Sequence, residues 1–277
     1  SKGFNIIKRF SEDIDLAIGH SFFGIENTSK NQREKLRKMA RGYIHETLSS
    51  QLDARLKEIG VAGYSIENVS RVQDQNGEWQ PIDSDKDPTV ILLHYPSILE
   101  DTINYIPPRV KIEISCLSMD EPTELRQIRS LIGDSFDGED TDAESAVRTV
   151  VPTRTFLEKL FLLAEEFQKE KPRSVRMSRH LYDLKKMMDT KYGNEALSNR
   201  ELYDAIVEHR KAYYALKYVN YDLHNPSTIN FTIPESAIKA WQDDYADMRR
   251  FFIYGESLEF DVLMRRIEEL QKRVKNI

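Results

Sequence analysis

The spacing of apolar residues predicts strands and one long helix in the first half of the chain. Apolar and polar side chains alternate over residues 9–18, and the Leu16-Ala17-Ile18 run at the end of this segment indicates a buried strand. Apolar residues then recur every three or four positions over 32–59, which predicts an amphipathic helix that Gly60 would end. Further strands, with a hairpin turn at Asn76-Gly77, are predicted at residues 64–72, 89–95 and 109–117.

Beyond Val151-Pro152 the spacing of apolar residues is helical almost throughout. It predicts helices at residues 156–167, 178–192, 199–219, 234–252 and 257–275. An acidic, glycine-containing stretch precedes this helical half and is typical of a loop. We therefore expect an α/β (α+β) core with a mixed sheet at residues 1–132, an acidic loop or linker at 133–150, and an all-helical domain at 151–277.

Composition narrows the class of protein. The 277 residues carry a net charge of −6, and they contain no run near the roughly 20 apolar residues that a membrane helix needs. The single cysteine, Cys116, fits a reducing compartment, and six scattered histidines without a CxxC motif argue against zinc. We expect a cytoplasmic protein without a membrane partner. Residues 171–217 hold 11 Lys or Arg against 6 Asp or Glu, a local excess of positive charge that could bind a polyanion.

Two carboxylates, Asp13 and Asp15, lie on one face of the first predicted strand, because side chains alternate along a strand. Adjacent negative charges repel each other, and a divalent cation offsets that cost. Oxygen ligands at this spacing suit Mg²⁺, which takes one or two carboxylates and completes its shell with water and substrate phosphates. The alternative is an acidic pair that caps a turn at the end of a strand.

A third carboxylate, Glu113, faces away from the core on a predicted strand that we expect to neighbour the first. From there it could reach a second cation about 3.5 to 4 Å from the first, the separation found in two-metal sites. We therefore predict Asp13, Asp15 and Glu113 as metal ligands. The alternative is an exposed strand face on which Lys111 and Glu113 are simply solvated.

Two charged residues of the helical half are candidates for chemistry. Lys159 borders the apolar face of a predicted helix, where a lysine usually keeps its ammonium in water but could also contact triphosphate oxygens. Asp183 shares a helical stripe with Arg176, Arg179 and His180, which is also typical of an ordinary intrahelical ion pair.

The segment at residues 210–218 interleaves basic residues with tyrosines. Such a surface could stack on unpaired bases and neutralise phosphates. The same pattern arises when a tyrosine stripe lies in a core beneath a solvated basic face. We prefer this second interpretation and keep the segment as a candidate RNA surface.

Four motifs resemble those of the abortive-infection nucleotidyltransferase toxins, the AbiEii/AbiGii family of the nucleotidyltransferase-fold superfamily. The string RFSEDIDLAI at residues 9–18, with SKG at the start of the chain, is similar to the first motif of that family. KIEIS at 111–115 is similar to its second conserved strand, and EKL at 158–160 and RHLYDL at 179–184 are similar to its remaining motifs. Family members carry a glycine-rich GG(T/S) turn upstream, so we expect this chain to lack that turn and to need it for full activity.

The resemblance implies a role for each candidate residue. Lys159 and Arg9 would bind nucleotide phosphates, and Ser11 would either touch the triphosphate or cap a turn. Asp183 would complete the site or orient the acceptor. The implied catalytic residues are Asp13, Asp15, Lys159 and Asp183.

The family resemblance also implies an activity and partners. The reaction would be Mg²⁺-dependent transfer of a nucleoside monophosphate from an NTP to an acceptor, with release of pyrophosphate, in a cleft between the two domains. RNA, and tRNA in particular, is the expected acceptor, and a cognate antitoxin is the expected partner in a toxin–antitoxin or phage-defence system. Two alternatives remain. One is a small-molecule nucleotidyltransferase of the antibiotic-modifying kind, and the other is a non-catalytic interaction protein with the same fold.

Overall fold

The computed structural model describes residues 2–11, 13–25, 29–74, 77–97, 107–117, 122–136 and 144–277. The chain forms two compact units. One comprises Ser11–Asp120 and is called the sheet unit here. The other comprises Ser1–Phe10 together with Glu121–Ile277 and is called the helical unit. The predicted class, a mixed α/β part followed by a largely helical part, is confirmed.

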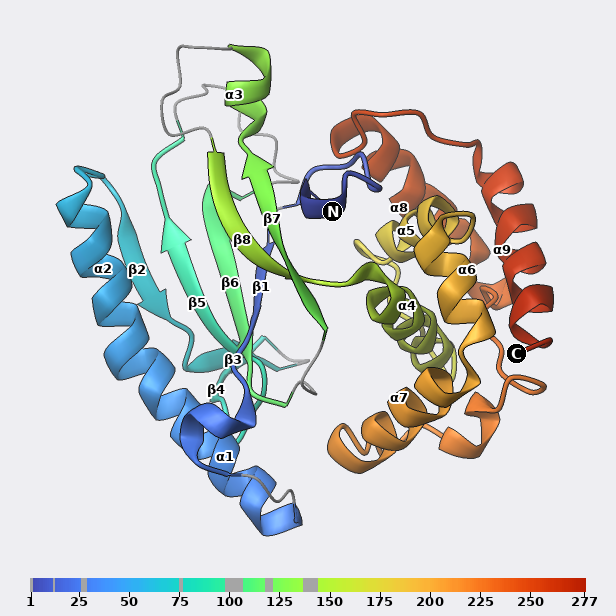
Figure 1. Cartoon of the computed structure of the whole chain (residues 1–277), viewed down its shortest axis with the longest axis horizontal. Coiled ribbons are helices and arrows are strands. Elements are labelled where there is room, and N and C mark those ends of the chain that lie inside the picture. Colours follow the sequence, from blue (N-terminus) through green and yellow to red (C-terminus); the bar gives the residue numbers. More distant parts are fainter. Residues whose placement is uncertain are drawn as a thin grey trace. The chain divides into compact units, whose positions relative to one another are not determined.

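The sheet unit is built on a mixed four-stranded sheet in the order β1-β6-β5-β2 (Figure 1). β1 runs parallel to β6, whereas β6, β5 and β2 pair antiparallel. Burial alternates along β6, where Ile112 and Ile114 are buried and Glu113 between them is not. The strands predicted at 89–95 and 109–117 are therefore confirmed. The four strands are β1 (Asp13–Ala17), β2 (Ser65–Asn68), β5 (Thr89–His94) and β6 (Arg109–Ser115).

The strand predicted at residues 64–72 is divided in the structure. Its first part is β2, and its second part, β3 (Arg71–Gln73), leaves the sheet to pair antiparallel with β4 (Trp79–Pro81). The predicted hairpin is therefore present, and Gly77 at its turn has a φ of +82°, a conformation that glycine adopts readily. Asn76 lies outside the described residues.

The helix predicted over residues 32–59 is confirmed as one continuous helical run. It consists of α1 (Lys30–Gly42), a π-helical turn η3 (Tyr43–Leu48) and α2 (Ser49–Glu58), and α2 lies beside β2 (Figure 1). Leu36 and Ile44 on its apolar face are fully buried. Gly60 ends the run with a φ of +81°, as its position predicts. A short 3₁₀ helix, η2 (His20–Phe23), precedes the run.

The expectation of a buried strand at Leu16-Ala17-Ile18 is wrong in one respect. β1 lies at the end of the sheet order, so Ile14 and Leu16 pair with the buried Ile112 and Ile114 and yet remain 46% and 43% exposed. An edge strand is covered along one side only, because a single neighbouring strand shields it. The apolar alternation located the strand correctly but not its place at the edge of the sheet.

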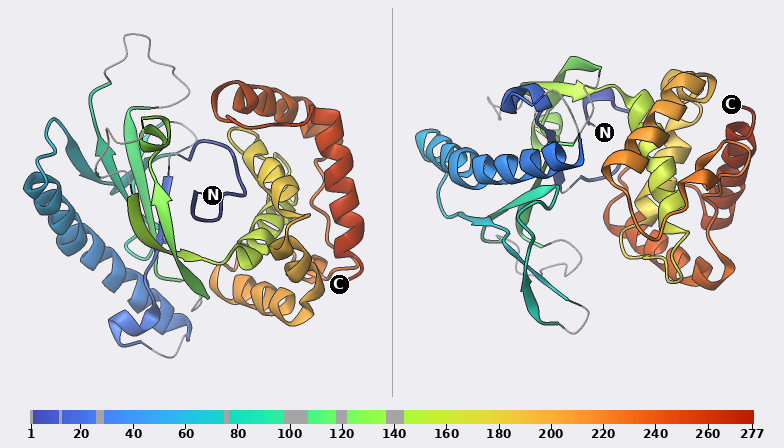
Figure 2. Two further views of the ribbon diagram at one scale, coloured as in Figure 1. Left: turned by 45° about the horizontal axis from the view of Figure 1, so that its top comes forward. Right: turned by 90° about the horizontal axis from the view of Figure 1, so that it is seen from below.

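The helical unit packs its helices around a core of large side chains that includes Tyr182, Tyr203 and Trp241. The N-terminal segment belongs to this unit, and Figure 2 shows it in dark blue beside the helices. No helix in the described part of the chain is long and apolar enough to cross a membrane. The helices are α4 (Pro152–Glu166), α5 (Ser178–Met187), α6 (Lys191–Ser198), α7 (Arg200–Tyr213), α8 (Ile238–Phe251) and α9 (Phe260–Val274), with 3₁₀ turns η1 (Lys2–Phe4), η4 (Tyr221–His224) and η5 (Glu235–Ala237).

The helix predicted at 178–192 is two helices, because the chain breaks between α5 and α6. The Thr190 hydroxyl accepts a hydrogen bond from the amide of Gly193 and caps the start of α6. A Cβ atom at Gly193 would lie only 2.3 Å from the Met187 carbonyl oxygen. Glycine therefore permits the close approach of α6 to the end of α5.

The stretch expected to be an acidic loop or linker is partly a strand. β8 (Glu144–Val150) pairs antiparallel with β7 (Thr123–Arg129), and a short helix α3 (Leu131–Ser135) follows β7. This pair contacts η1, since the Arg126 guanidinium donates a hydrogen bond to the Gly3 carbonyl oxygen at 2.8 Å. The pair belongs to the helical unit, which the predicted boundaries at 132 and 150 did not anticipate.

Candidate active site

The predicted metal ligands lie on two adjacent strands of the sheet unit. β1 and β6 are parallel and in a register that pairs Asp13 with Lys111 and Asp15 with Glu113. Paired residues of parallel strands project to the same face, so all four side chains share the face opposite Ile112 and Ile114. The prediction that Glu113 stands on a neighbouring strand, turned away from the core, is confirmed.

The charges on this face are partly balanced within the strands. The Lys111 ammonium lies 2.7 Å from the Glu113 carboxylate, and the Glu113 side chain is 26% exposed. Among the described residues no group of three or more His, Cys, Asp or Glu side chains is arranged to hold a metal ion. The donors nevertheless fit Mg²⁺, because this ion uses only one or two carboxylates and takes its other ligands from water and substrate.

Ser11 lies just before β1 and is exposed. Its hydroxyl donates to the Asp13 carbonyl oxygen at 3.5 Å, the long end of hydrogen-bond distances. This contact spans two residues and corresponds to the local turn that the sequence offered as one alternative for Ser11.

A buried ion cluster of Arg9, Lys159 and Asp183 lies in the helical unit. The Asp183 carboxylate on α5 is fully buried, and both of its oxygens accept from the Arg9 guanidinium at 2.8 Å. The Lys159 ammonium on α4 lies 2.9 Å from one of these oxygens. Such a bidentate arginine–carboxylate pair fixes orientation as well as distance. The cluster is therefore held rigidly by three segments of the chain.

Backbone contacts hold the N-terminal arm of this cluster in place. Arg9 pairs with Ile253 in an isolated β-bridge, and the Phe10 amide donates to the Phe252 carbonyl oxygen at 2.8 Å. The Tyr182 hydroxyl donates to the Lys8 carbonyl oxygen at 3.4 Å. The segment before β1 is thus bound to the helical unit by its main chain, which aims Arg9 at Asp183.

Electrostatics within the cluster favour the charged form of Asp183. Burial alone would raise the pKa of this carboxyl, but the adjacent Lys159 and Arg9 outweigh burial and hold the pKa well below its usual range. The neighbouring His180 is also buried, and burial together with the positive charges of Lys159 and Arg179 lowers the pKa of its imidazole. His180 is therefore neutral at pH 7, and the two cations and one carboxylate leave one net positive charge.

The helical stripe predicted around Asp183 does not include Arg176. α5 begins at Ser178, and Arg176 precedes it with a φ of +60°, so Arg176 does not continue the helical face. The carboxylate of Asp244 on α8 accepts hydrogen bonds from the amides of Arg176 and Ser178, which fixes the start of α5. Arg9 and Lys159 both contact Asp183 from outside α5. The spacing of residues in the sequence does not predict the contact between Arg9 and Asp183.

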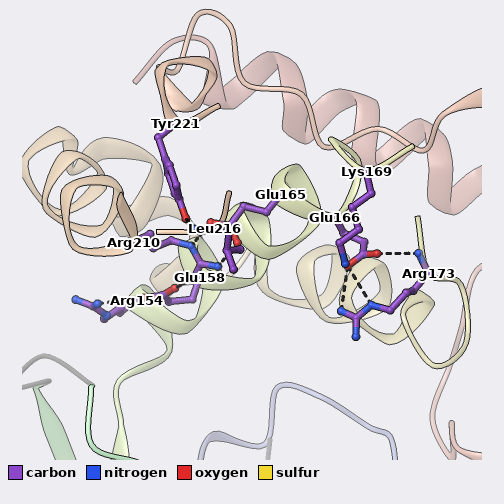
Figure 3. A network of polar contacts seen from close by, with 9 residues as sticks. All are labelled: Arg154, Glu158, Glu165, Glu166, Lys169, Arg173, Arg210, Leu216 and Tyr221. Carbon is purple, nitrogen blue, oxygen red and sulfur yellow. Dashed lines mark hydrogen bonds and ion pairs between the residues drawn. The ribbon is translucent and has the colours of Figure 1, made fainter. Parts of the chain in front are cut away.

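The segment at 210–218 does not form the predicted core tyrosine stripe, because Tyr214 and Tyr218 are 41% and 45% exposed and only Arg210 is buried. Arg210 is buried and binds Glu165 on α4, with Nε at 2.7 Å from the carboxylate, as well as Glu158 (Figure 3). These two carboxylates raise the pKa of Arg210 against the opposing effect of burial. Tyr213 stacks on His209, and the Arg210 guanidinium lies over the Tyr214 ring.

A second group in the same network, Glu166 with Lys169 and Arg173, stabilises the end of α4 (Figure 3). Glu166 is buried, and its carboxylate accepts from the Arg173 amide at 2.7 Å and from the guanidinium at 3.0 Å. Both groups belong to the packing around α4, whereas Lys211, Tyr214, Lys217 and Tyr218 remain exposed, so the segment stays a candidate RNA surface.

A comparison with known protein families identifies the family of the chain. Residues 1–266 match the family model described as nucleotidyl transferase AbiEii toxin, type IV toxin–antitoxin system. The chain belongs to this family, and it is therefore a nucleotidyltransferase toxin of a type IV toxin–antitoxin system, with an NTP as substrate and an antitoxin as partner. No curated protein matches the chain.

Proposed function

We propose that this protein transfers a nucleoside monophosphate from an NTP to a hydroxyl group of RNA in a Mg²⁺-dependent reaction. The family supplies the reaction class. The observation that carries the assignment of residues is the buried cluster in which Asp183 holds Arg9 and Lys159. Two cations against one carboxylate leave a positive charge for a triphosphate, which is the chemistry that nucleotidyl transfer requires.

In this proposal Lys159 and Arg9 bind phosphate oxygens. Their side chains are 18% and 10% exposed, so each retains some access to a ligand while it is held by Asp183. Asp183 is fully buried and acts as a positioning residue for both cations. Preorganised charges of this kind stabilise the transition state without reorganisation during the reaction.

The carboxylates Asp13, Asp15 and Glu113 would hold Mg²⁺. When bound, this ion supplies charge neutralisation at the α-phosphate and the leaving pyrophosphate and lowers the pKa of the acceptor hydroxyl.

RNA is proposed as the acceptor on the basis of charge. Although the chain is acidic overall, residues 171–217 carry an excess of positive charge. A locally basic segment in an acidic protein favours a polyanionic partner. Small molecules do not require such a segment, and they become the next candidates if RNA is not labelled.

The test is incorporation of label from each α-labelled NTP into total bacterial RNA in the presence of Mg²⁺. We expect a discrete labelled RNA band with the wild-type protein, and loss of that band with Lys159→Ala and with Asp13→Ala. Lys272→Ala on α9 is the control, because it removes an exposed charge of the same kind and should leave labelling unchanged. Labelling that persists in Lys159→Ala would overturn the assignment of the phosphate site.

A further inference from the structure

A cavity of about 290 Å³ lies within the helical unit, and it is separate from the contacts of Asp183. Tyr182, Lys185 and Lys186 of α5 line one side of it. Tyr245 of α8 and Leu263 of α9 are buried and line other parts of the wall. The cavity thus combines an apolar lining with two cationic side chains.

Helix α5 presents different residues to the cavity and to the buried ion cluster. Tyr182, Lys185 and Lys186 are related by three- and four-residue steps, which places them on one face of a helix. Asp183 is turned by about 100° from Tyr182, since an α-helix has 3.6 residues per turn, and its carboxylate contacts Arg9 and Lys159 instead. The cavity is therefore a neighbour of the proposed NTP site and does not share its ligands.

The charges around the cavity favour an anion. Among the described residues, neither Lys185 nor Lys186 lies within ion-pair distance of a carboxylate, although Lys186 lies 5.7 Å from the centre of the Tyr182 ring. Partial burial, followed by the charges of Lys186 and Arg266, lowers the pKa of Lys185, and the opposing charges of Asp189 and Glu256 have smaller effects. Glu256 also lines the cavity and is exposed, so it keeps its hydration and opposes an anion only weakly.

A hydroxyl group completes the polar lining. Ser257 Oγ accepts a hydrogen bond from Arg249 Nε at 3.1 Å, which leaves its own proton to be donated to a ligand. Two ammonium groups and one hydroxyl donor are a suitable donor set for a phosphate group. Bound phosphate would also relieve the repulsion between Lys185 and Lys186.

We infer that this cavity binds a phosphate group, carried either by an RNA strand or by a small free anion. The inference rests on the proposed function only in naming RNA as one possible carrier. Lys185, Lys186 and Ser257 are the residues that would contact the phosphate. Binding there would fix one phosphate of the acceptor next to the helix that carries Asp183.

The test is protection of lysines from acetylation, read residue by residue by mass spectrometry on the full chain. The probes are inorganic phosphate and a short single-stranded RNA, each compared with sodium chloride at the same ionic strength. We expect Lys185 and Lys186 to react severalfold more slowly in the presence of a probe. Lys272 and Lys275, which are exposed on the far part of α9 and beyond its end, serve as internal controls and should react equally in all samples.

The two carriers give different patterns. Protection by both probes assigns a site for any phosphate, and protection by RNA alone assigns a site for a phosphate within a strand. Equal reactivity of Lys185 and Lys186 with and without both probes would overturn the inference. The readout needs no turnover, so a protein that binds phosphate here but labels no RNA refutes the proposed function alone, and active protein with unprotected lysines refutes this inference alone.

A matched pair of double variants gives a second measurement. Lys185→Ala/Lys186→Ala should reduce the slope of log affinity for RNA against log salt concentration by about 1.4, the value expected when two contacts to a single strand are lost. Lys272→Ala/Lys275→Ala removes the same charge from outside the cavity and should change the slope less. Equal slopes for the two double variants would contradict a specific phosphate site.

Discussion

The two groups of carboxylates in this protein differ in burial and in their partners. Asp183 in the helical unit is fully buried, with Arg9 and Lys159 against its oxygens. Asp15 in the sheet unit is exposed and paired in register with Glu113, another carboxylate. The first group is a complete electrostatic unit in the protein alone. The second brings like charges together beside Lys111, and we propose that it binds a cation.

This difference in burial predicts different roles in stability and in catalysis for the two groups of carboxylates. A buried carboxylate between two cations supports the fold, because removal of one partner leaves uncompensated buried charge. Exposed carboxylates contribute little to the free energy of folding, and we propose that Asp13 and Asp15 serve to bind a cation. Asp183 is therefore expected to matter for stability and activity together, and Asp13 and Asp15 for activity alone.

The largest predicted effect is that of Asp183→Ala. Without the carboxylate, the partly buried Arg9 and Lys159 lose their partner, and the free energy of unfolding should fall by about 3–5 kcal/mol. Urea unfolding followed by circular dichroism measures this change. Asp189→Ala is the matched control, because Asp189 is 55% exposed and pairs with Arg266 and Arg273 at the surface, where about 1 kcal/mol or less is expected. Equal losses in the two variants would contradict the distinction.

Asp15→Asn should affect catalysis without affecting the fold. We expect the rate of label transfer to fall about a thousandfold, equal to about 4 kcal/mol of transition-state stabilisation, because a ligand of the proposed cation is lost. The unfolding free energy should change by less than about 0.5 kcal/mol, as is usual at an exposed position. A large loss of stability in this variant would show that the two carboxylate groups do not differ as described.

Magnesium should stabilise the wild-type protein through the sheet unit. A ligand present at ten times its Kd raises the free energy of unfolding by about 1.4 kcal/mol. A thermal shift measured with and without Mg²⁺ would detect this gain, and Asp15→Asn should show much less of it. Asp189→Ala should keep the full shift, and a shift retained by Asp15→Asn would place the cation elsewhere.

The smallest predicted effect concerns pH and His180. Burial and the nearby cations lower the pKa of His180, so the unfolded chain binds a proton below about pH 6.5 that the folded chain does not. Stability should therefore decrease as pH falls below 6.5, by up to about 1.4 kcal/mol at pH 5.5. Asp183, whose pKa is also lowered, contributes a further loss only in stronger acid, below its ordinary value of about 3.9.

A comparison of variants isolates the contribution of His180. Unfolding curves at pH 7.5 and 5.5 should differ less for His180→Gln than for the wild type. Gln242→Ala, which changes an exposed uncharged residue of α8, should retain the wild-type pH dependence. The same pH dependence in His180→Gln and in the wild type would contradict the assignment.

Much of the fold could be predicted from the spacing of apolar residues. The long helix ending at Gly60 and the strands around Glu113 follow from periodicity, because each has one clearly buried face. β8 was missed since most of its side chains are exposed, so its sequence shows no apolar face. The break between α5 and α6 depends on a close backbone approach at Gly193, which a period-based prediction does not detect.

The candidate site was predictable in part. Asp13, Asp15 and Glu113 could be placed on one sheet face, because strand alternation is local and β1 and β6 are neighbours. The contact between Arg9 and Asp183 joins residues 174 positions apart and depends on tertiary packing. The spacing of charges along the helix suggested that Asp183 pairs with residues of its own helix. A buried carboxylate needs cationic partners, and here they come from other segments, as Arg9 and Lys159.

The most direct test of nucleotidyl transfer compares α-labelled with γ-labelled NTP in the same reaction with RNA, Mg²⁺ and wild-type protein. We predict that the α-label enters RNA and that the γ-label appears only in released pyrophosphate. Transfer of the γ-label to RNA would identify phosphoryl transfer instead and would contradict the roles assigned here to Asp13, Asp15, Lys159 and Arg9.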